Sequence, residues 1–258
     1  MSKKINRVGE EGINKFGSKM IIKEYRKYKD IDVYFPKYNW VFKHTQYTHF
    51  KNGNIKCPYE PRYYDKGYLG EGKYKVWKND KTTDEYNIWY NMLKRCYDPK
   101  CHKEYPTYKG CRVEDYLLNF QNMGEWIKEN YYEIPGEKMC LDKDILCKGN
   151  KIYSRDTCIF VPERINTLFV KRDNNRGKDP IGMYQLSSGN YQVQCNNEYG
   201  KYVYLGTYNT KEEAFRVYKE YKEKVIKKVI DSYEGKIPEP YYSKLRNAMY
   251  NYEVEIDD

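Results

Sequence analysis

Four side chains between residues 96 and 111 are of the types that bind zinc. They are Cys96, Cys101, His102 and Cys111, and thiolates and imidazoles are the usual ligands of structural zinc. Sites of that kind mostly supply paired cysteines in a Cys-x2-Cys spacing. The cysteines here are five and ten residues apart, so we expect single buried thiols and no zinc site.

A second set of polar side chains lies between residues 139 and 166. Residues 139–146 predict one strand and residues 157–162 a second strand, with a turn at Gly149-Asn150 between them. Pro162 then opens a helix that carries Asn166. The order is strand, loop, strand and helix, which is a ββα outline.

This outline resembles a divergent HNH unit of phage homing-endonuclease-like proteins. In that family the first strand carries a metal-binding Asp or His and a catalytic His, and an Asn on the helix is a further ligand. The resemblance implies that Asp142 takes the metal-ligand position and that Lys143 stands where the general-base His is expected. It also implies that Asn150 belongs to the Gly-Asn loop, that Cys158 takes the second-strand position and that Asn166 is the helix ligand.

The same resemblance implies Mg²⁺ as the cofactor, held by Asp142 and Asn166, because a hard cation stabilises charge on a phosphate under attack. Lys143 departs from the family at the residue that activates water, and an ammonium is a poor base. The unit therefore either binds DNA without cutting it or nicks DNA by modified chemistry. A third interpretation is structural, with Asp142 and Asp144 as strand-end carboxylates paired with Lys143 or Lys151.

The C-terminal part predicts three antiparallel strands between residues 180 and 206, joined by two turns. Thr210 then forms a capping box with Glu213, three residues later. Apolar residues at helical spacing follow the cap: Ala214, Tyr218, Tyr221, Val225 and Val229.

Three strands and one helix in this order resemble the AP2 DNA-binding domain. The matching segments are Gly182, Gly189-Asn190-Tyr191, Tyr204-Leu205-Gly206-Thr207-Tyr208 and Thr210-Lys211-Glu212-Glu213-Ala214. Side chains alternate along a strand, so Val193 and Cys195 should face the helix while Gln192 and Gln194 face outward.

In the AP2 family the outer sheet face lies in the major groove and is rich in arginine. Here the resemblance places Gln and Tyr on that face, at Tyr184, Gln192, Gln194, Tyr202 and Tyr204. Gln can read adenine with two hydrogen bonds, and Tyr can contact a phosphate or a thymine methyl group. The alternative is a module for protein interaction or structure.

Three basic side chains precede this domain in a polar linker. Lys171, Arg172 and Arg176 stand between the two predicted modules, beside Asn and Gly residues. We expect them to follow DNA phosphates.

The first 66 residues predict a small basic β module. Residues 19–25, 31–35 and 40–43 have the alternation and length of short strands, which favours an antiparallel meander or barrel. Its Phe and Trp residues are expected in the core. Its tyrosines could belong to the core or stack on bases.

Two amphipathic helices are predicted before the ββα outline. Residues 84–96 and 113–130 carry apolar side chains three and four positions apart. We assign them to the same central region, residues 80–170.

The net charge of +10 is unevenly distributed along the 258 residues. Residues 1–81 have a net charge of +10, residues 82–170 of −1 and residues 171–258 of +1, although four acids occupy the last eight positions. Two basic ends around a neutral centre favour a polyanionic partner.

The composition excludes several protein classes. No apolar run is long enough for a membrane span, and no signal peptide is recognisable. Eight cysteines without such a signal favour thiols in a reducing compartment. We expect a cytoplasmic location in a bacterial host cell, with no membrane contact and no small-molecule cofactor.

The sequence thus predicts an α+β protein built from small units. They are an N-terminal β meander or barrel over 1–66, the helices and HNH-like ββα unit over 80–170, an AP2-like domain over 180–232 and a tail over 233–258. The expected function is that of a phage DNA-binding protein of homing-endonuclease type, acting on double-stranded DNA with or without Mg²⁺-dependent cleavage. The alternative is an inactive DNA-binding regulator, or a phage effector that binds a host defence protein.

Overall fold

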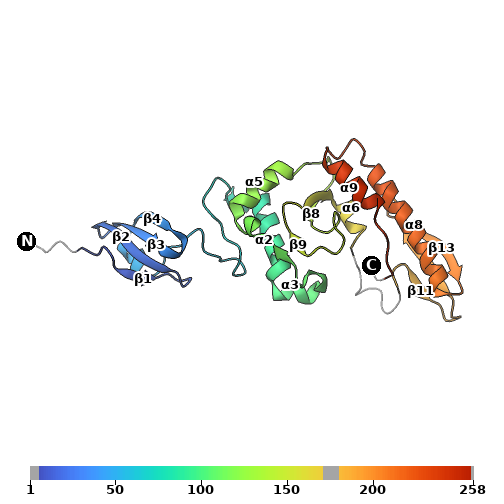
Figure 1. The fold of residues 1–258 in the computed structure, drawn as a ribbon, viewed down its shortest axis with the longest axis horizontal. Coiled ribbons are helices and arrows are strands. Elements are labelled where there is room, and N and C mark those ends of the chain that lie inside the picture. Colours follow the sequence, from blue (N-terminus) through green and yellow to red (C-terminus); the bar gives the residue numbers. More distant parts are fainter. Residues whose placement is uncertain (1–5, 171–179, 257–258) are drawn as a thin grey trace, which may run out of the picture. The chain divides into compact units, whose positions relative to one another are not determined.

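A computed structural model describes residues 6–170 and 180–256 of the chain (Figure 1). Lys171, Arg172 and Arg176, which the sequence assigns to phosphate contacts, lie outside the described residues. The fold is α+β, with several small antiparallel sheets. The chain divides into two compact units, residues 1–129 and 130–258.

The first unit begins with a four-stranded antiparallel meander in the order β1-β2-β3-β4. Its core forms because inward positions of β2 and β3 are apolar, and Met20, Ile22, Ile31, Val33 and Phe35 are fully buried. The strands are β1 (Glu11–Ile13), β2 (Lys19–Lys27), β3 (Asp30–Phe35) and β4 (Trp40–Thr45), followed by helix α1 (Tyr47–Lys51).

Helices form the second half of this unit. α2 (Asp84–Tyr97) is capped by Thr83, whose side chain accepts a hydrogen bond from the Tyr86 amide. Asp84, which the sequence suggests as the cap, is instead the first residue of the helix. The predicted helix over 113–130 is divided at Asn119 into α4 (Asp115–Leu118) and α5 (Phe120–Asn130). Remaining short elements are β5 (Trp77–Lys78), β6 (Lys81–Thr82), α3 (Pro99–Glu104) and β7 (Arg112–Val113).

The second unit begins with the strand, loop, strand and helix that the sequence predicts. β8 (Met139–Asp142) pairs antiparallel with β10 (Ile159–Pro162), and Asp142 stands opposite Ile159. The short β9 (Ile152–Tyr153) lies in the connection. Helix α6 (Glu163–Thr167) follows Pro162 directly.

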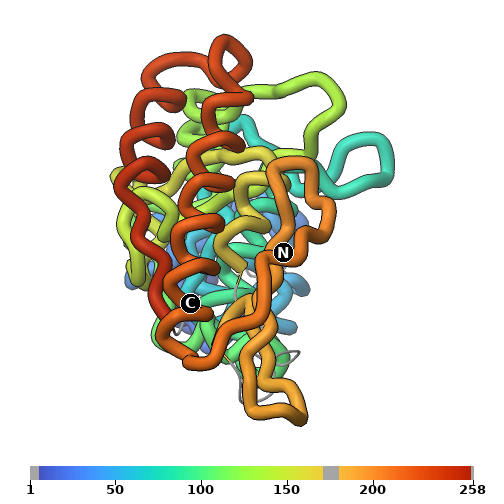
Figure 2. Tube along the Cα trace, turned by 90° about the vertical axis from the view of Figure 1, so that its right-hand side faces the viewer, coloured from blue at the N-terminus to red at the C-terminus, as the bar shows by residue number. Residues whose placement is uncertain are grey.

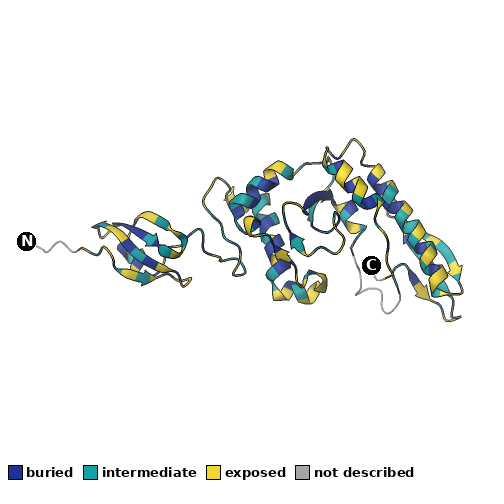
Figure 3. Cartoon of the chain, viewed as in Figure 1, coloured by how far each residue is buried: buried dark blue, intermediate teal, exposed yellow. Residues whose placement is uncertain are grey.

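A three-stranded antiparallel sheet in the order β11-β12-β13 completes this unit together with two helices. The strands are β11 (Met183–Gln185), β12 (Tyr191–Asn196) and β13 (Tyr202–Tyr208). α8 (Lys211–Asp231) begins at Thr210, whose hydroxyl accepts from the Glu213 amide at 3.2 Å, as the capping box predicts. α8 covers the inner face of the sheet, and its buried residues follow one side of the helix (Figure 3).

The segment after residue 232, expected as a tail, contains a packed helix. α9 (Tyr241–Tyr250) runs beside α8 and buries Tyr242, Leu245 and Met249 (Figure 2). Val254, beyond the helix, is also buried. The expectation of a tail over 233–258 rested on the acidic residues at its end and did not consider the apolar spacing of Tyr242, Leu245 and Met249.

One hydrophobic core joins the ββα outline to the β11–β13 sheet. Ile159, Val161 and Ile165 belong to the same buried cluster as Val193 and Val225. The two regions therefore share one core and are not the separate modules that the sequence predicts over 80–170 and 180–232. Since the unit boundary falls at residue 129, the helices α2 and α5 belong with the N-terminal meander.

No helix among residues 6–170 and 180–256 has a stretch long and apolar enough to cross a membrane.

Candidate functional site

Asp142 stands at the end of β8, where the chain turns away from the sheet. Its Oδ1 accepts hydrogen bonds from the backbone amides of Asp144 at 2.8 Å and Ile145 at 2.7 Å. Burial raises the pKa of Asp142 to about 6, and the neighbouring Asp144 carboxylate adds to the increase. Oδ2 accepts no hydrogen bond from the residues that the structure describes, so it is the oxygen that could bind a cation.

Lys143 points into the protein, although it follows the end of a strand. Its residue is 5% exposed, and the Nζ atom donates to Asp144 Oδ2 at 2.7 Å and to the Asn150 carbonyl at 3.0 Å. The Tyr153 ring lies 5.8 Å from the same ammonium. The Lys143 ammonium thus holds the loop after β8 to the turn at Asn150. The resemblance requires a different group at position 143, namely a base that can reach water.

Asn150 closes the same loop from the other side. Its Nδ2 donates to the carbonyls of Lys143 at 2.6 Å and Ile152 at 2.8 Å, while its Oδ1 accepts from the Ile152 amide. Gly149 precedes it with a φ of +80°, the left-handed conformation that favours glycine in a turn. The predicted Gly-Asn loop is therefore a structural turn in which every Asn150 group has a partner.

Asn166 lies on α6, half-buried, and Cys158 is buried just before β10. Asp142 Oδ2 and the Asn166 amide oxygen are hard donors of the kind that Mg²⁺ accepts, and water would have to supply most of the remaining ligands. The donor types fit the cation. The base that the resemblance requires is absent, because Lys143 is committed to its ion pair.

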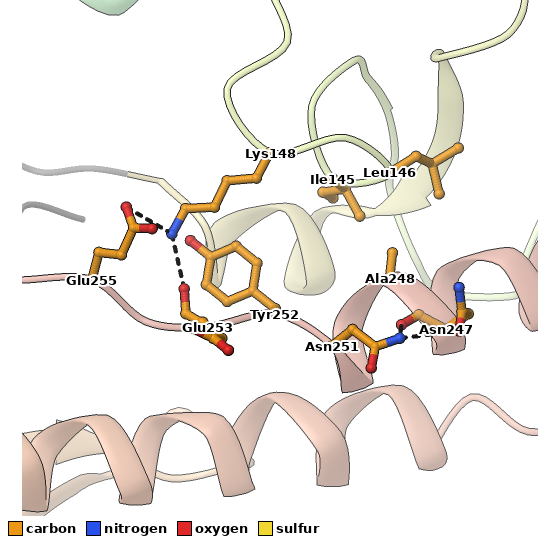
Figure 4. A pocket seen from close by; sticks show the side chains of 9 residues that line it. All are labelled: Ile145, Leu146, Lys148, Asn247, Ala248, Asn251, Tyr252, Glu253 and Glu255. Atoms are coloured by element: carbon orange, nitrogen blue, oxygen red, sulfur yellow. Dashed lines mark hydrogen bonds and ion pairs between the residues drawn. The ribbon is translucent and has the colours of Figure 1, made fainter.

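A pocket of about 330 Å³ lies beside the same loop (Figure 4). It separates Ile145 and Leu146 from α9 and the segment that follows it. Lys148 closes one end, donating to the Glu253 carbonyl at 2.8 Å and pairing with Glu255 at 3.3 Å, with the Tyr252 ring 4.7 Å away. The acidic C-terminal segment thus binds the ammonium group of Lys148, which belongs to the ββα loop.

The outer face of the β11–β13 sheet is a different environment. Tyr184, Gln192 and Thr207 form one cross-strand row, because Tyr184 pairs with Gln192 and Gln192 with Thr207. Gln194 and Tyr204 form the next row, after a bulge between Val193 and Gln194. The five residues that the sequence assigns to DNA contact therefore share one face.

Exposure separates the two faces of this sheet. Tyr184, Tyr202 and Tyr204 are 37%, 59% and 55% exposed, whereas Val193 on the inner face is fully buried. The phenol of Tyr202 donates to Gln194 Oε1, and the hydroxyls of Tyr204 and Thr207 are 2.8 Å apart. These lateral contacts keep the outer side chains oriented while leaving their edges to solvent.

Gly182 sets the distance between this sheet and α8. It has a φ of +74°, and a Cβ at this position would lie 2.0 Å from Cε2 of Tyr218. Only glycine allows the Tyr218 ring to approach the start of β11 so closely. Close packing against Tyr218 therefore explains why position 182 of this chain is a glycine.

The zinc-type residues of the first unit do not converge. The one group of three potential ligands in the described part of the chain is Asp30, Asp32 and His44. Arg26 occupies its centre, since Nε donates to Asp30 Oδ2 at 3.0 Å and Nη2 contacts both Asp32 and His44. The guanidinium lowers the pKa of Asp30 to about 2, with a smaller contribution from His44. A cation already fills this cluster, so it needs no metal.

Sequence reasoning missed two features of this chain that bear on function. One is the burial of Lys143, which no local pattern signals because its partner Asn150 belongs to a later turn. The other is the hairpin β5–β6. The dipeptide Asn79-Asp80 between its two strands could have indicated the turn, since Asn and Asp readily adopt positive φ.

No protein-family model, curated protein or solved structure matches this chain.

Proposed function

We propose that this protein binds double-stranded DNA through the outer face of the β11–β13 sheet. The observation that carries the proposal is the face of exposed Tyr and half-buried Gln side chains on a sheet whose opposite face is filled by α8. A sheet supported in this way is rigid, so binding would order few side chains and would cost little conformational entropy.

The chemistry of this face suits bases more than phosphates. Gln192 and Gln194 can each donate and accept along the edge of an adenine, and the tyrosine rings add apolar area for thymine methyl groups. No arginine or lysine lies among the five residues Tyr184, Gln192, Gln194, Tyr202 and Tyr204. We therefore propose a preference for A·T-rich duplex DNA, with a shallow salt dependence of this contact.

The test is duplex binding by fluorescence anisotropy at two salt concentrations. The variant Gln192→Ala/Gln194→Ala/Tyr204→Ala should lose about tenfold or more in affinity, since each base contact contributes roughly 1–3 kcal/mol of discrimination. The control Glu220→Ala/Lys224→Ala changes exposed residues of α8 and leaves the net charge unchanged. Equal affinity of both variants for duplex DNA would exclude the sheet face as the contact.

Metal-dependent nicking is the second candidate function, and the unsatisfied Oδ2 of Asp142 supports it. If a cation binds there, it would stabilise charge on a phosphate, with Asp142 and Asn166 as its protein ligands. The test is relaxation of supercoiled plasmid with and without Mg²⁺. Nicking that survives both Asp142→Ala and Asn166→Ala would remove these residues from the assignment.

Binding to a host protein is the non-catalytic alternative, and the commitment of Lys143 to Asp144 and Asn150 favours it over nicking. Affinity purification from host lysate, before and after nuclease treatment, distinguishes it from DNA binding. A partner retained after nuclease treatment points to protein recognition.

A further inference from the structure

The hairpin β5–β6 of the first unit presents an exposed tryptophan on a short, well-anchored support. Trp77 is 63% exposed, while Trp89 and Trp126 are 0% and 5% exposed. Leaving an indole in water gives up the stabilisation that burial of so large an apolar surface provides. Trp77 lies at the start of the hairpin, where it pairs with Thr82, and its indole is open to a partner.

The hairpin holds the backbone at Trp77 in a fixed position. Trp77 pairs with Thr82 and Lys78 with Lys81, and the turn residues Asn79 and Asp80 both have positive φ values, 51° and 58°. Two such residues in a two-residue loop make the type I′ turn, whose twist matches that of the strands.

Thr83 fastens the base of the hairpin to helix α2. Its hydroxyl donates to the Lys75 carbonyl at 2.7 Å, and its amide donates to the Val76 carbonyl at 3.0 Å. The same hydroxyl caps α2 by accepting from the Tyr86 amide. Trp77 is therefore preorganised rather than part of a loose loop.

Three exposed lysines lie on or directly before the same hairpin: Lys75 is two residues before Trp77, while Lys78 and Lys81 form the neighbouring cross-strand pair. Lys75, Lys78 and Lys81 are exposed, and none of them, nor the exposed Asp80, takes part in an ion pair among the residues that the structure describes.

Lys78 and Lys81 are directly opposite each other across the strand pair. Like charges in that position repel and weaken a hairpin, unless an anion binds between them. Two like charges in this register thus favour an anionic partner over an apolar one.

We propose that the β5–β6 hairpin binds nucleic acid with unstacked bases, with Trp77 stacking on a base and the three lysines contacting flanking phosphates. A ring with a free face accepts any base, and lysines beside it neutralise the backbone, which is the combination used for single strands. This surface uses none of the residues of the sheet face, so either proposal can fail alone.

The first test uses the full-length chain and a single-stranded oligothymidine. Titration should quench the intrinsic tryptophan fluorescence of the wild type. Trp77→Phe should abolish most of the quenching, because Trp89 and Trp126 are buried and Trp40 is half-buried on a different element. Trp77→Ala should weaken binding about tenfold, and Trp77→Phe should weaken it less, because phenylalanine still stacks. Quenching of the same size in Trp77→Phe would overturn the proposal.

A matched control is Tyr116→Ala, which removes an exposed ring of α4 that follows Glu114 and Asp115 instead of lysines. It should leave oligothymidine affinity unchanged. Thermal unfolding of each variant verifies that the exposed substitutions leave the fold intact. If Trp77→Ala and Tyr116→Ala have the same effect on affinity, the hairpin is not the contact.

The second test addresses the lysines. Lys75→Gln/Lys78→Gln/Lys81→Gln should reduce the slope of log affinity against log salt by about 2 for single strands. An unchanged slope would overturn the phosphate contacts. Loss of oligothymidine binding in these variants with duplex binding intact would separate this surface from the sheet face, whereas the sheet-face variant should show the reverse.

Discussion

The loop after β8 and the outer face of the β11–β13 sheet both carry polar side chains, but they use them differently. In the loop, Lys143 and Asn150 form hydrogen bonds with partners of the same loop. On the sheet, Tyr202 and Tyr204 remain more than half exposed. Polar groups that satisfy one another inside a protein stabilise one conformation, whereas exposed ones are available to a partner.

This difference bears on the two resemblances that the sequence suggests. The ββα outline is present as secondary structure, yet the position that the resemblance gives to a base is occupied by a buried ammonium. The sheet keeps an open face, although its chemistry is that of Gln and Tyr. The proposal that follows from this difference gives the first region a scaffold role and the second a binding role.

The largest expected effect tests whether the sheet face depends on its support by α8. Gly182→Ala should destabilise the second unit by about 3–5 kcal/mol, because it adds a Cβ 2.0 Å from the Tyr218 ring at a φ of +74°. Gly189→Ala is the control, with a φ of +88° and no atom within 4 Å, and should cost about 1 kcal/mol. Urea unfolding measures both, and equal costs would contradict the close packing against α8.

The next effect tests the scaffold role of Lys143. Lys143→Met should destabilise the protein by roughly 2 kcal/mol, since it leaves the Asn150 carbonyl and Asp144 without their donor. Lys201→Met, at an exposed position of the turn before β13, should change stability by about 0.5 kcal/mol or less. If Lys143→Met is neutral for stability but alters plasmid nicking, the loop is a reaction site and the comparison with the sheet fails.

The smallest effect concerns the pH dependence of stability. Since burial raises the pKa of Asp142 from 3.8 to about 6, its contribution is fully present below pH 3.8 and is lost as the pH rises through 6. Asp142→Asn keeps the oxygen that accepts from Asp144 and Ile145. The free energy of unfolding of the variant minus that of the wild type should therefore be about 1–2 kcal/mol larger at pH 8 than at pH 4.

Mg²⁺ gives this pH experiment a second outcome. A cation at Asp142 would favour the charged carboxylate and stabilise the wild type at pH 8 but not Asp142→Asn. An identical response of both proteins to Mg²⁺ would support the scaffold interpretation. The same measurement with Asn166→Ala tests the second ligand.

Much of the local structure was predictable because it is encoded in periodicity and caps. The alternation around Val193 and Gln194 gave the two faces of the sheet, and the apolar spacing after Thr210 gave the buried side of α8. The packing of α9 was not predicted, because its apolar residues follow Pro238 and Pro240 in a segment that ends in acids. The shared core of the ββα and sheet regions was also missed, since their contacts join segments far apart in sequence.

The sequence by itself determined the longer periodic elements, such as β12, β13 and α8, and the side of each that turns inward, because hydrophobic patterns with periods of 2 and 3.6 act locally. Only the tertiary structure decided which polar side chains are engaged. Lys143 donates to the Asn150 carbonyl seven residues later, and Lys148 donates to the Glu253 carbonyl 105 residues later. Neither separation follows from a hydrophobic period. The exposure of Trp77 was likewise decided by the tertiary structure, in which Thr83 holds its hairpin and the ring is 63% exposed.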